Sequence, residues 1–312
     1  MAKSGIKVSA PATVTNIAGG LTTLGMALEL PADEIIIKEG SRPGLVITEI
    51  RGASKRLSYD IGKNPAGLAA QSLLSYLGEN DRPVELEIHK KIPSDAGLGS
   101  TAALAAAGVF AVQEYLRAGM SKQELLPFAA VGLQTDDNDA LLAHLFPALL
   151  GGMILKTDDT ISSYKKLYIP SGLCVAVIYP ETGRMNKNQV QQTLESNIQL
   201  KESNEQAAHL AAFVASMYTS DFELMIQALQ NTISSSIPTD AIPYFYDMRN
   251  IALQTGAKGF GAAGFGPSMF ALCTDSGTAK DIIDAAKILY KTKKTSISTY
   301  FSKVNHEGAI AF

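Results

Sequence analysis

The sequence predicts two α+β domains, and three observations lead to that prediction. Strand-like and helix-like segments are mixed along the chain, without the strict alternation of a doubly wound sheet. The chain has 312 residues, enough for one large domain or two with a substantial core. A polar stretch at residues 157–166 separates the halves. We place the boundary there, between an N-terminal domain of residues 1–160 and a C-terminal domain of residues 161–312.

The composition is that of an ordinary soluble globular protein. Hydrophobic residues make up 46% and charged residues 18%, and the formal net charge is -3, so neither a nucleic-acid nor a membrane partner is expected. No apolar signal segment opens the sequence, and the longest apolar run, residues 102–112, is shorter than the roughly 20 residues that cross a bilayer. Cys174 and Cys273 lie in apolar runs, as buried free thiols of a reducing compartment do. We expect a cytoplasmic protein; the oligomeric state, a homodimer included, stays open.

In the first half, apolar alternation and turn signals define the elements. Residues 11–16 are predicted as a turn. Pro65 opens a helix that runs to Leu77, because proline is well tolerated at the first helical position. Ser121 and Glu124 have the spacing of a capping box, which opens another helix. Strands are predicted at residues 6–10, 24–28, 34–38, 45–50 and 84–90.

The second half is dominated by helical patterns around a glycine loop at residues 259–267. This glycine loop leads into a predicted strand at residues 268–273. Further strands are predicted at residues 153–155, 173–179 and 296–301. Helices are predicted at residues 188–200, 204–217, 221–229, 243–255 and 278–289.

The strongest candidate for a functional site is a second glycine-bearing segment, the phosphate loop at residues 93–103. It follows the predicted strand 84–90 and opens an alanine-rich run, residues 102–116, that is typical of a buried helix. Gly97 and Gly99 let backbone N–H groups turn toward one point, where the helix N-terminus adds about half a positive charge. The order of strand, glycine-bearing segment 93–103 and helix therefore predicts phosphate binding.

An alternative interpretation is an ordinary turn before a helix. Ser100 and Thr101 are residue types found at N-caps, and no lysine follows Gly99 as it would in a Walker A loop. The whole string is more specific: it resembles the phosphate loop of the GHMP small-molecule kinases and differs from the usual form only at Thr101, where that family has serine. The resemblance implies that ATP is bound by Pro93, Ser94, Asp95, Ala96, Gly97, Leu98, Gly99, Ser100, Thr101, Ala102 and Ala103.

Three further stretches resemble the same family in order and spacing. Residues 7–16 are similar to its first motif and residues 261–272 to its third, a glycine loop that braces the phosphate loop from the second domain. The run Pro-Ala-Leu-Leu-Gly-Gly at 147–152 looks like a segment of the homoserine kinase branch. The glycines of the third motif are Gly261, Gly264 and Gly266.

Over nearly the full length, this resemblance implies a two-domain GHMP-kinase fold, with an N-terminal phosphate-loop domain and a C-terminal α+β sandwich domain. The implied activity is ATP-dependent phosphorylation of the side-chain hydroxyl of a small molecule, L-homoserine, in threonine biosynthesis. ATP and Mg²⁺ are the implied cofactors.

Departures from the family pattern lie where substrate and metal should bind. Thr22 stands where the family has an aspartate for the substrate ammonium, and Leu133 stands at the position of a magnesium-binding carboxylate. Mg²⁺ prefers hard oxygen ligands, so the candidates are the Thr101 hydroxyl and a nearby carboxylate. The nearby carboxylates are Asp136, the first candidate, with Asp137 and Asp139. The usual histidine, aspartate and asparagine before residue 147 are replaced by Leu141, Ala143 and His144.

An amino-acid substrate needs partners for both its ammonium and its carboxylate. Asn16, at the family's asparagine position, and Thr22 offer neutral hydrogen bonds. Arg184 and Arg249 lie near the positions of the family's carboxylate-binding arginines, with Lys187 as a further cation.

Three functions therefore compete at this point. The first is a homoserine kinase with a rearranged pocket, which the overall match favours. The second is a GHMP kinase for another small alcohol. The third is a relative without catalysis, kept for nucleotide binding or assembly.

Overall fold

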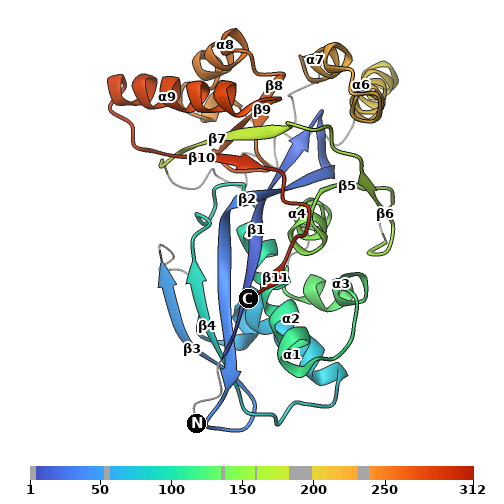
Figure 1. The fold of residues 1–312 in the computed structure, drawn as a ribbon, viewed down its shortest axis with the longest axis vertical. Coiled ribbons are helices and arrows are strands. Elements are labelled where there is room, and N and C mark those ends of the chain that lie inside the picture. The colour runs from blue at the N-terminus through green and yellow to red at the C-terminus, as the bar shows by residue number, and fades with distance from the viewer. Residues whose placement is uncertain (1–4, 53–56, 135–137, 159, 183–198, 231–238) are drawn as a thin grey trace.

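The protein contains two β-sheets with helices packed on them (Figure 1). The structure is a computed structural model that describes residues 5–52, 57–134, 138–158, 160–182, 199–230 and 239–312. The first half of the chain forms the lower part of the molecule in Figure 1 and most of the second half forms the upper part. The last strand returns to the first sheet. This is the predicted α+β class, with strands and helices of both sheets unevenly interleaved.

The first sheet has the strand order β11-β1-β2-β4-β3, and β5 and β6 extend it from β2. The strands β3 and β4 pair in parallel, whereas the other described pairs in this sheet are antiparallel. The bounds are β1 Ile6–Ile17, β2 Gly20–Glu39, β3 Leu45–Gly52, β4 Val84–Lys90, β5 Met153–Lys156, β6 Tyr164–Leu167 and β11 Ile310–Ala311.

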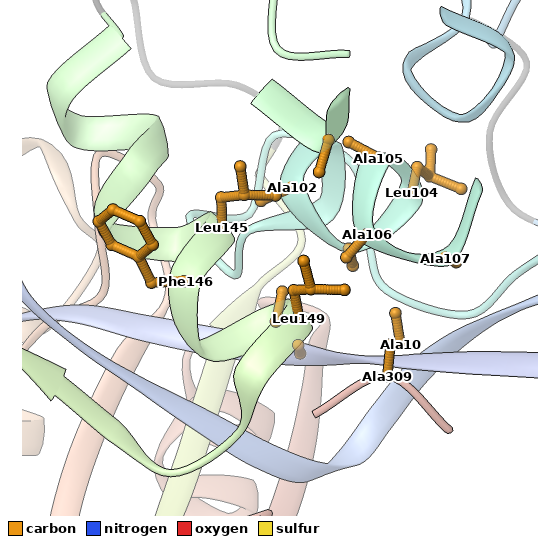
Figure 2. Close-up of a cluster of buried hydrophobic side chains, with 14 of the residues drawn as sticks. Ala10, Ala102, Leu104, Ala105, Ala106, Ala107, Leu145, Phe146, Leu149 and Ala309 are labelled. Carbon is orange, nitrogen blue, oxygen red and sulfur yellow. The ribbon is translucent and has the colours of Figure 1, made fainter. Parts of the chain in front are cut away.

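Helices cover one face of this sheet, and α2 lies at their centre. Figure 2 shows small side chains of α2 beside larger ones of α4, above Ala10 of β1 and Ala309. Alanine lets α2 approach both β1 and α1 closely, and a Cβ on Gly108 would lie only 2.3 Å from the Ala66 carbonyl oxygen. The helices are α1 Pro65–Tyr76, α2 Ser100–Leu116, α3 Lys122–Val131 and α4 Asn138–Leu150, with a short 3₁₀ turn at Ile61–Lys63.

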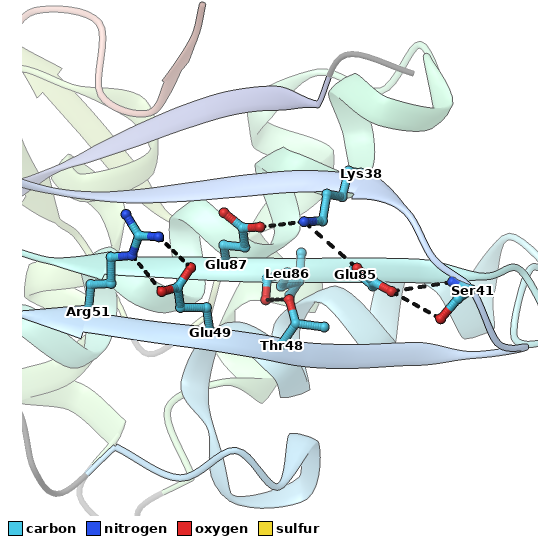
Figure 3. Close-up of polar contacts among 8 residues, drawn as sticks. All are labelled: Lys38, Ser41, Thr48, Glu49, Arg51, Glu85, Leu86 and Glu87. Carbon is cyan, nitrogen blue, oxygen red and sulfur yellow. Dashed lines mark hydrogen bonds and ion pairs between the residues drawn. The ribbon is translucent and has the colours of Figure 1, made fainter. Parts of the chain in front are cut away.

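The other face of the first sheet is polar. Along β4 the burial alternates, so Glu85 and Glu87 point away from the core, as the sequence pattern predicted. Lys38 of β2 contacts both carboxylates, and Arg51 pairs with Glu49 on β3 (Figure 3). Exposed ion pairs of this kind contribute at most about 1 kcal/mol each. These ion pairs therefore contribute little to stability.

The second sheet is antiparallel, with the order β10-β7-β9-β8. One face joins the core of the first sheet together with α6 and α7, and the other packs on α8 and α9. The strands are β7 Cys174–Pro180, β8 Gly259–Ala262, β9 Met269–Cys273 and β10 Ile297–Lys303. The helices are α6 Leu200–Thr219, α7 Phe222–Gln230, α8 Phe245–Thr255 and α9 Ser276–Thr292, with a 3₁₀ turn at Thr239–Ala241.

Two predictions for the first half were wrong. The expected turn at 11–16 is part of β1, and the strands expected at 24–28 and 34–38 are one strand, β2. Because β1 and β2 pair with each other along most of their length, this ladder carries both strands past their prolines, with a register shift between Pro11 and Thr13. Proline lacks a donor but keeps its carbonyl acceptor.

The sequence also missed the helix α4, the strand β6 and the strand β11. Pro147 lies inside α4 and obscured its helical pattern. The helix expected at 188–200 lies outside the described residues except for its last two. The boundary proposed between 160 and 161 falls in the turn between β5 and β6, so the first sheet continues to Leu167.

Two local predictions were confirmed: the capping box and the burial of both cysteines. The capping box of Ser121 and Glu124 opens α3. Cys174 and Cys273 are free and buried opposite each other on β7 and β9, and burial raises the pKa of their thiols to about 11 and about 12. Within the described part of the chain, no helix has the length and apolar character that spanning a membrane requires.

The crossing of α1 and α2 generates a stability prediction. Gly108→Val places a side chain against the Ala66 backbone, which cannot retreat as a flexible side chain would. We expect a loss of unfolding free energy of at least ~1–3 kcal/mol from overpacking, measured by urea denaturation. Gly62→Ala is the matched control, because its Cβ would meet only Asp60 Oδ1 at 3.5 Å. Equal stability of the two variants would contradict the close crossing.

Candidate functional site

The segment between β4 and α2 turns three times with a positive φ. Asp95, Gly97 and Gly99 have φ angles of 60°, 78° and 69°, and glycine adopts this region without the steric cost that other residues meet. Gly99 is the N-cap of α2, and no side chain caps that helix. Ser100 and Thr101 are therefore first-turn residues of α2. The alternative interpretation of these hydroxyls as ordinary N-caps was wrong.

The N-terminus of α2 has the properties of an anion site. The first N–H groups of a helix have no acceptor within the helix, and in α2 no capping side chain accepts a hydrogen bond from them. The helix dipole adds partial positive charge at the same place. Gly97, Ser100 and Thr101 are half-buried, so solvent reaches the first turn on their side. A phosphate group can therefore accept several of these N–H bonds at once.

The glycine loop packs against the phosphate loop with no room for side chains between them. A Cβ on Gly97 would lie 2.0 Å from the Ala263 carbonyl oxygen, and one on Gly266 would lie 2.0 Å from the Gly97 nitrogen. The Ser268 N–H donates a hydrogen bond of 3.2 Å to the Ala96 carbonyl. The second half of the chain therefore braces the phosphate loop, as the resemblance implied.

The three expected glycines of this loop have different positions. Gly264 and Gly266 contact the phosphate loop, since a Cβ on Gly264 would lie 2.9 Å from the Gly97 carbonyl oxygen. Gly261 lies within β8, where its nearest neighbour is the ring of Phe270.

His144 of α4 contacts three other segments: β1, the phosphate loop and the glycine loop. Its Nδ1 lies 2.7 Å from Thr13 Oγ1, and its Nε2 lies 3.2 Å from Thr15 Oγ1, both on β1. A Cβ on Gly99 would lie 2.8 Å from Nδ1, and one on Gly264 would lie 2.8 Å from Nε2. The imidazole therefore fills the space between the phosphate loop and the glycine loop, with a hydroxyl at each ring nitrogen.

Burial keeps this histidine neutral. It lowers the pKa of His144 to about 4, and a neutral imidazole has one donor and one acceptor nitrogen. Thr13 also links β1 to the phosphate loop directly, because its N–H donates a hydrogen bond of 3.0 Å to the Leu98 carbonyl. Sequence reasoning noted His144 only as a departure from the family pattern. Its signal was a histidine on an apolar helix, with no partner nearby in the sequence.

The proposed substrate residues lie near the β1–β2 turn. Asn16 has a φ of 65°, and its Nδ2 donates to the Ala262 carbonyl of β8 at 3.2 Å. Thr22 is half-buried on β2. Sequence reasoning missed Gln206 of α6, whose Nε2 donates to the Gly19 carbonyl at 2.9 Å. The turn is thus held by both a strand and a helix of the second half.

Of the proposed cationic residues, the structure describes Arg249. Arg249 lies on α8, whose buried residues belong to the core on the outer face of the second sheet. Ala96 and Leu98 of the phosphate loop belong to the other core. Arg184 and Lys187 lie outside the described residues.

The proposed metal ligands are only partly described. Thr101 is half-buried in the first turn of α2, and Leu133 is buried. Asp136 and Asp137 lie outside the described residues, as does the side chain of Asp139 in α4. Where side chains are described, no group of three or more His, Cys, Asp or Glu could hold a metal ion.

Comparison with known protein families identifies both halves of the chain. The description "GHMP kinases N terminal domain" matches residues 64–151, which contain the phosphate loop. The description "GHMP kinases C terminal" matches residues 211–292, which contain the glycine loop. The two matched segments are those that the structure packs together at Gly97 and Gly266.

Similar proteins extend this match to nearly the whole chain. A homoserine kinase of Chlorobium phaeobacteroides is 31% identical, with 96% of this chain and 97% of that protein covered. A homoserine kinase of Thermoplasma acidophilum is 27% identical over 98% of this chain and 93% of that protein. The crystal structure of a homoserine kinase from Cytophaga hutchinsonii superposes with a TM-score of 0.92 at 32% identity, covering 99% and 98% of the two chains. The Methanococcus jannaschii mevalonate kinase, at 14% identity and a TM-score of 0.73 over 97% and 99% of the two chains, shares the fold.

The buried histidine generates a pH prediction. Burial lowers the pKa of His144 from 6.5 to about 4, so between these values the unfolded chain binds a proton that the folded chain excludes. The stability from neutral His144 is complete above pH 6.5 and is lost as the pH falls toward 4, by roughly 3 kcal/mol. His144→Gln can bond both threonines without titrating. We expect its unfolding free energy, measured in urea at pH 7 and pH 4.5, to fall less than that of the wild type; equal falls would contradict the buried neutral imidazole.

Proposed function

This chain belongs to the GHMP kinases, and on that premise we propose that it is a homoserine kinase, which transfers the γ-phosphoryl group of ATP to the side-chain hydroxyl of L-homoserine in threonine biosynthesis. The observation that carries the proposal is the likeness to homoserine kinases over both halves of the chain, at 31% identity in sequence and a TM-score of 0.92 in structure. The enzyme class, an ATP-dependent small-molecule kinase, follows from the family.

The residues of the phosphate loop fit the phosphates of ATP. The uncapped N-terminus of α2 offers N–H donors, and the positive φ angles of Gly97 and Gly99 turn the backbone toward that helix end. ATP supplies the group that is transferred, and the charge that builds up on its phosphates is what a fixed set of donors stabilises. The chain's own task is positioning. It is met because β1 holds Leu98 and the glycine loop holds Ala96 before any ligand arrives.

For Mg²⁺ we propose the Thr101 hydroxyl and a carboxylate, with Asp136 as the first candidate. The hydroxyl is half-buried and next to the proposed phosphate position. Oxygen ligands of this kind, completed by water and nucleotide phosphates, suit Mg²⁺. The choice of Asp136 rests on its distance along the chain from the family's acidic position, Leu133.

For the substrate we propose a site beside the β1–β2 turn, where Asn16 and Thr22 lie. These side chains offer neutral hydrogen bonds, and a zwitterion that loses water needs charged partners as well. Arg184 remains a proposed partner of the carboxylate, with Lys187 as a further cation. Arg249, on α8, is a second proposed partner of the carboxylate.

A second candidate function is a GHMP kinase that acts on another small alcohol. The observation in its favour is Thr22, which replaces the acidic residue expected to bind an ammonium group. A cytoplasmic location is a further prediction from the sequence, and the oligomeric state, a homodimer included, stays open.

Purified protein tests the choice of substrate directly. With ATP and Mg²⁺ we expect ADP formation that depends on L-homoserine, measured in a coupled assay, and O-phosphohomoserine as the product by mass spectrometry. Mevalonate, galactose and other small alcohols serve as controls. Turnover of one of these alcohols and none of homoserine would support the second function. Nucleotide binding without turnover on any of them would support a relative without catalysis.

The Thr101 hydroxyl generates a separate prediction. Thr101→Val keeps the shape of the side chain and removes the hydroxyl; because Thr101 does not cap α2, the loss of stability should stay below the ~1 kcal/mol of a lost cap. We expect Mg²⁺ to strengthen ADP binding less than in the wild type, measured by calorimetry with and without Mg²⁺. Ser100→Ala, the neighbouring half-buried hydroxyl, is the matched control. An undiminished effect of Mg²⁺ in Thr101→Val would rule out the metal contact.

A further inference from the structure

An ion pair buried inside the first sheet lies directly before the phosphate loop. Lys90, the last residue of β4, places its Nζ 2.5 Å from Oδ2 of Asp33 on β2. The exposed fractions of the two side chains are 2% and 0%. Both residues continue the core-facing alternation of their strands, in phase with Ile35 on β2 and Ile88 on β4. Two charged residues thus occupy positions where the pattern of the sheet calls for apolar ones.

Asp33 also binds the backbone that leads into the phosphate loop. Its Oδ1 accepts hydrogen bonds from the N–H groups of Lys91 at 2.7 Å and Ile92 at 2.8 Å. Lys90 Nζ donates in turn to the Ile92 carbonyl at 2.6 Å. Both polar backbone groups of Ile92 are therefore held, immediately before Pro93.

The described strand ladders end before these two residues. The pairing of β2 with β4 ends at Glu34 and His89, and the pairing of β3 with β4 ends at Gly52 and Lys90. Buried backbone N–H groups that leave a ladder need another acceptor. The Asp33 carboxylate is that acceptor, so it extends the order of the sheet by two residues beyond the strand.

From this geometry we propose that Asp33 is a positioning residue for nucleotide binding: it fixes Lys91 and Ile92, and through them the direction in which the phosphate loop leaves the sheet. Lys90 neutralises the carboxylate and holds the Ile92 carbonyl. The assignment rests on the proposed binding of nucleotide phosphates at the loop. Asp33 acts at a distance, and no contact of its own with the nucleotide is implied.

A purely stabilising role accounts less well for this pair. Removal from water opposes both charges, and it raises the pKa of Asp33 and lowers the pKa of Lys90. Two apolar side chains of similar size often replace a buried ion pair without loss of stability. What apolar side chains cannot replace is the acceptor for the two N–H groups, and an unpaired buried N–H is costly.

Two double variants separate these roles. Asp33→Leu with Lys90→Met removes both charges and the acceptor. Asp33→Asn with Lys90→Met also removes both charges, but the amide oxygen can still accept from Lys91 and Ile92. Because both lack the ion pair and the lysine, the difference in their nucleotide affinity reports the acceptor alone.

The neighbouring ion pair is a matched control. Glu34 and Lys91 are one residue further along each strand segment, with Lys91 Nζ 2.6 Å from Glu34 Oε1. This pair is on the polar side, where the Lys91 side chain is 53% exposed. Glu34→Leu with Lys91→Met likewise removes one negative and one positive charge without touching the acceptor, although it also removes the partner of Lys7.

The measurements are calorimetric titration with ADP and unfolding in urea. We expect Asp33→Leu with Lys90→Met, the Leu/Met variant, to bind ADP at least ~10-fold more weakly than the wild type. We expect Asp33→Asn with Lys90→Met, the Asn/Met variant, and the control at Glu34 and Lys91 to keep an affinity within about 3-fold of the wild type. ADP affinity should thus depend on whether the side chain of residue 33 can accept the two hydrogen bonds. It should not depend on how the unfolding free energies of the three double variants compare. Equal affinities of the Leu/Met and Asn/Met variants would overturn the assignment.

Three other outcomes also test the assignment. Should the Leu/Met variant not fold, Asp33→Val with Lys90→Met is the smaller replacement suited to a strand; if neither apolar variant folds, the role is one of stability and the assignment falls. A wild type that binds no ADP would overturn the proposed function and this assignment together. A wild type that binds ADP, with variants that bind it equally well, would overturn this assignment alone.

Discussion

The structure depends on one close backbone contact, between the phosphate loop and the glycine loop. At Gly97 and Gly266 the two chains approach so closely that a Cβ on either would lie 2.0 Å from a backbone atom of the other loop. Only residues without side chains permit this approach. The contact joins the two halves of the chain directly behind the end of α2, so whatever binds there is held by both. The packing of β8 and β9 behind the glycine loop, and of α4 behind the phosphate loop, serves this contact.

The phosphate loop is held at several points before any ligand arrives. The Ser268 N–H binds Ala96, the Thr13 N–H binds Leu98, and the Asp33 carboxylate binds the two N–H groups that precede Pro93. Each anchor comes from a different segment of the chain. Donors fixed in this way need little reorganisation when charge develops on a phosphoryl group, which is the main contribution that a protein makes to phosphoryl transfer.

Local patterns predicted several elements of the fold, and non-local pairing explains the errors. The strand at 84–90 and the capping box at Ser121 matched the structure because alternation and capping depend on a few neighbouring residues. The expected turn at 11–16 failed because β1 pairs with β2 on both sides of Pro11, and hydrogen bonds to a distant strand override local turn preference.

The sequence by itself determined the phosphate loop, its glycines and the family, because these are encoded in one short string with fixed spacing. It also contained an unexplained signal, a charged residue in phase with the core face of each of two strands. Only the tertiary structure decided that Asp33 meets Lys90, and that His144 meets Thr13 and Thr15. These partners are 57, 131 and 129 residues apart, and no periodicity spans such distances. Strand order and the packing of α4 on β1 bring these partners together. Buried polar groups need hydrogen-bond partners, and the tertiary fold determines which groups are close enough to serve.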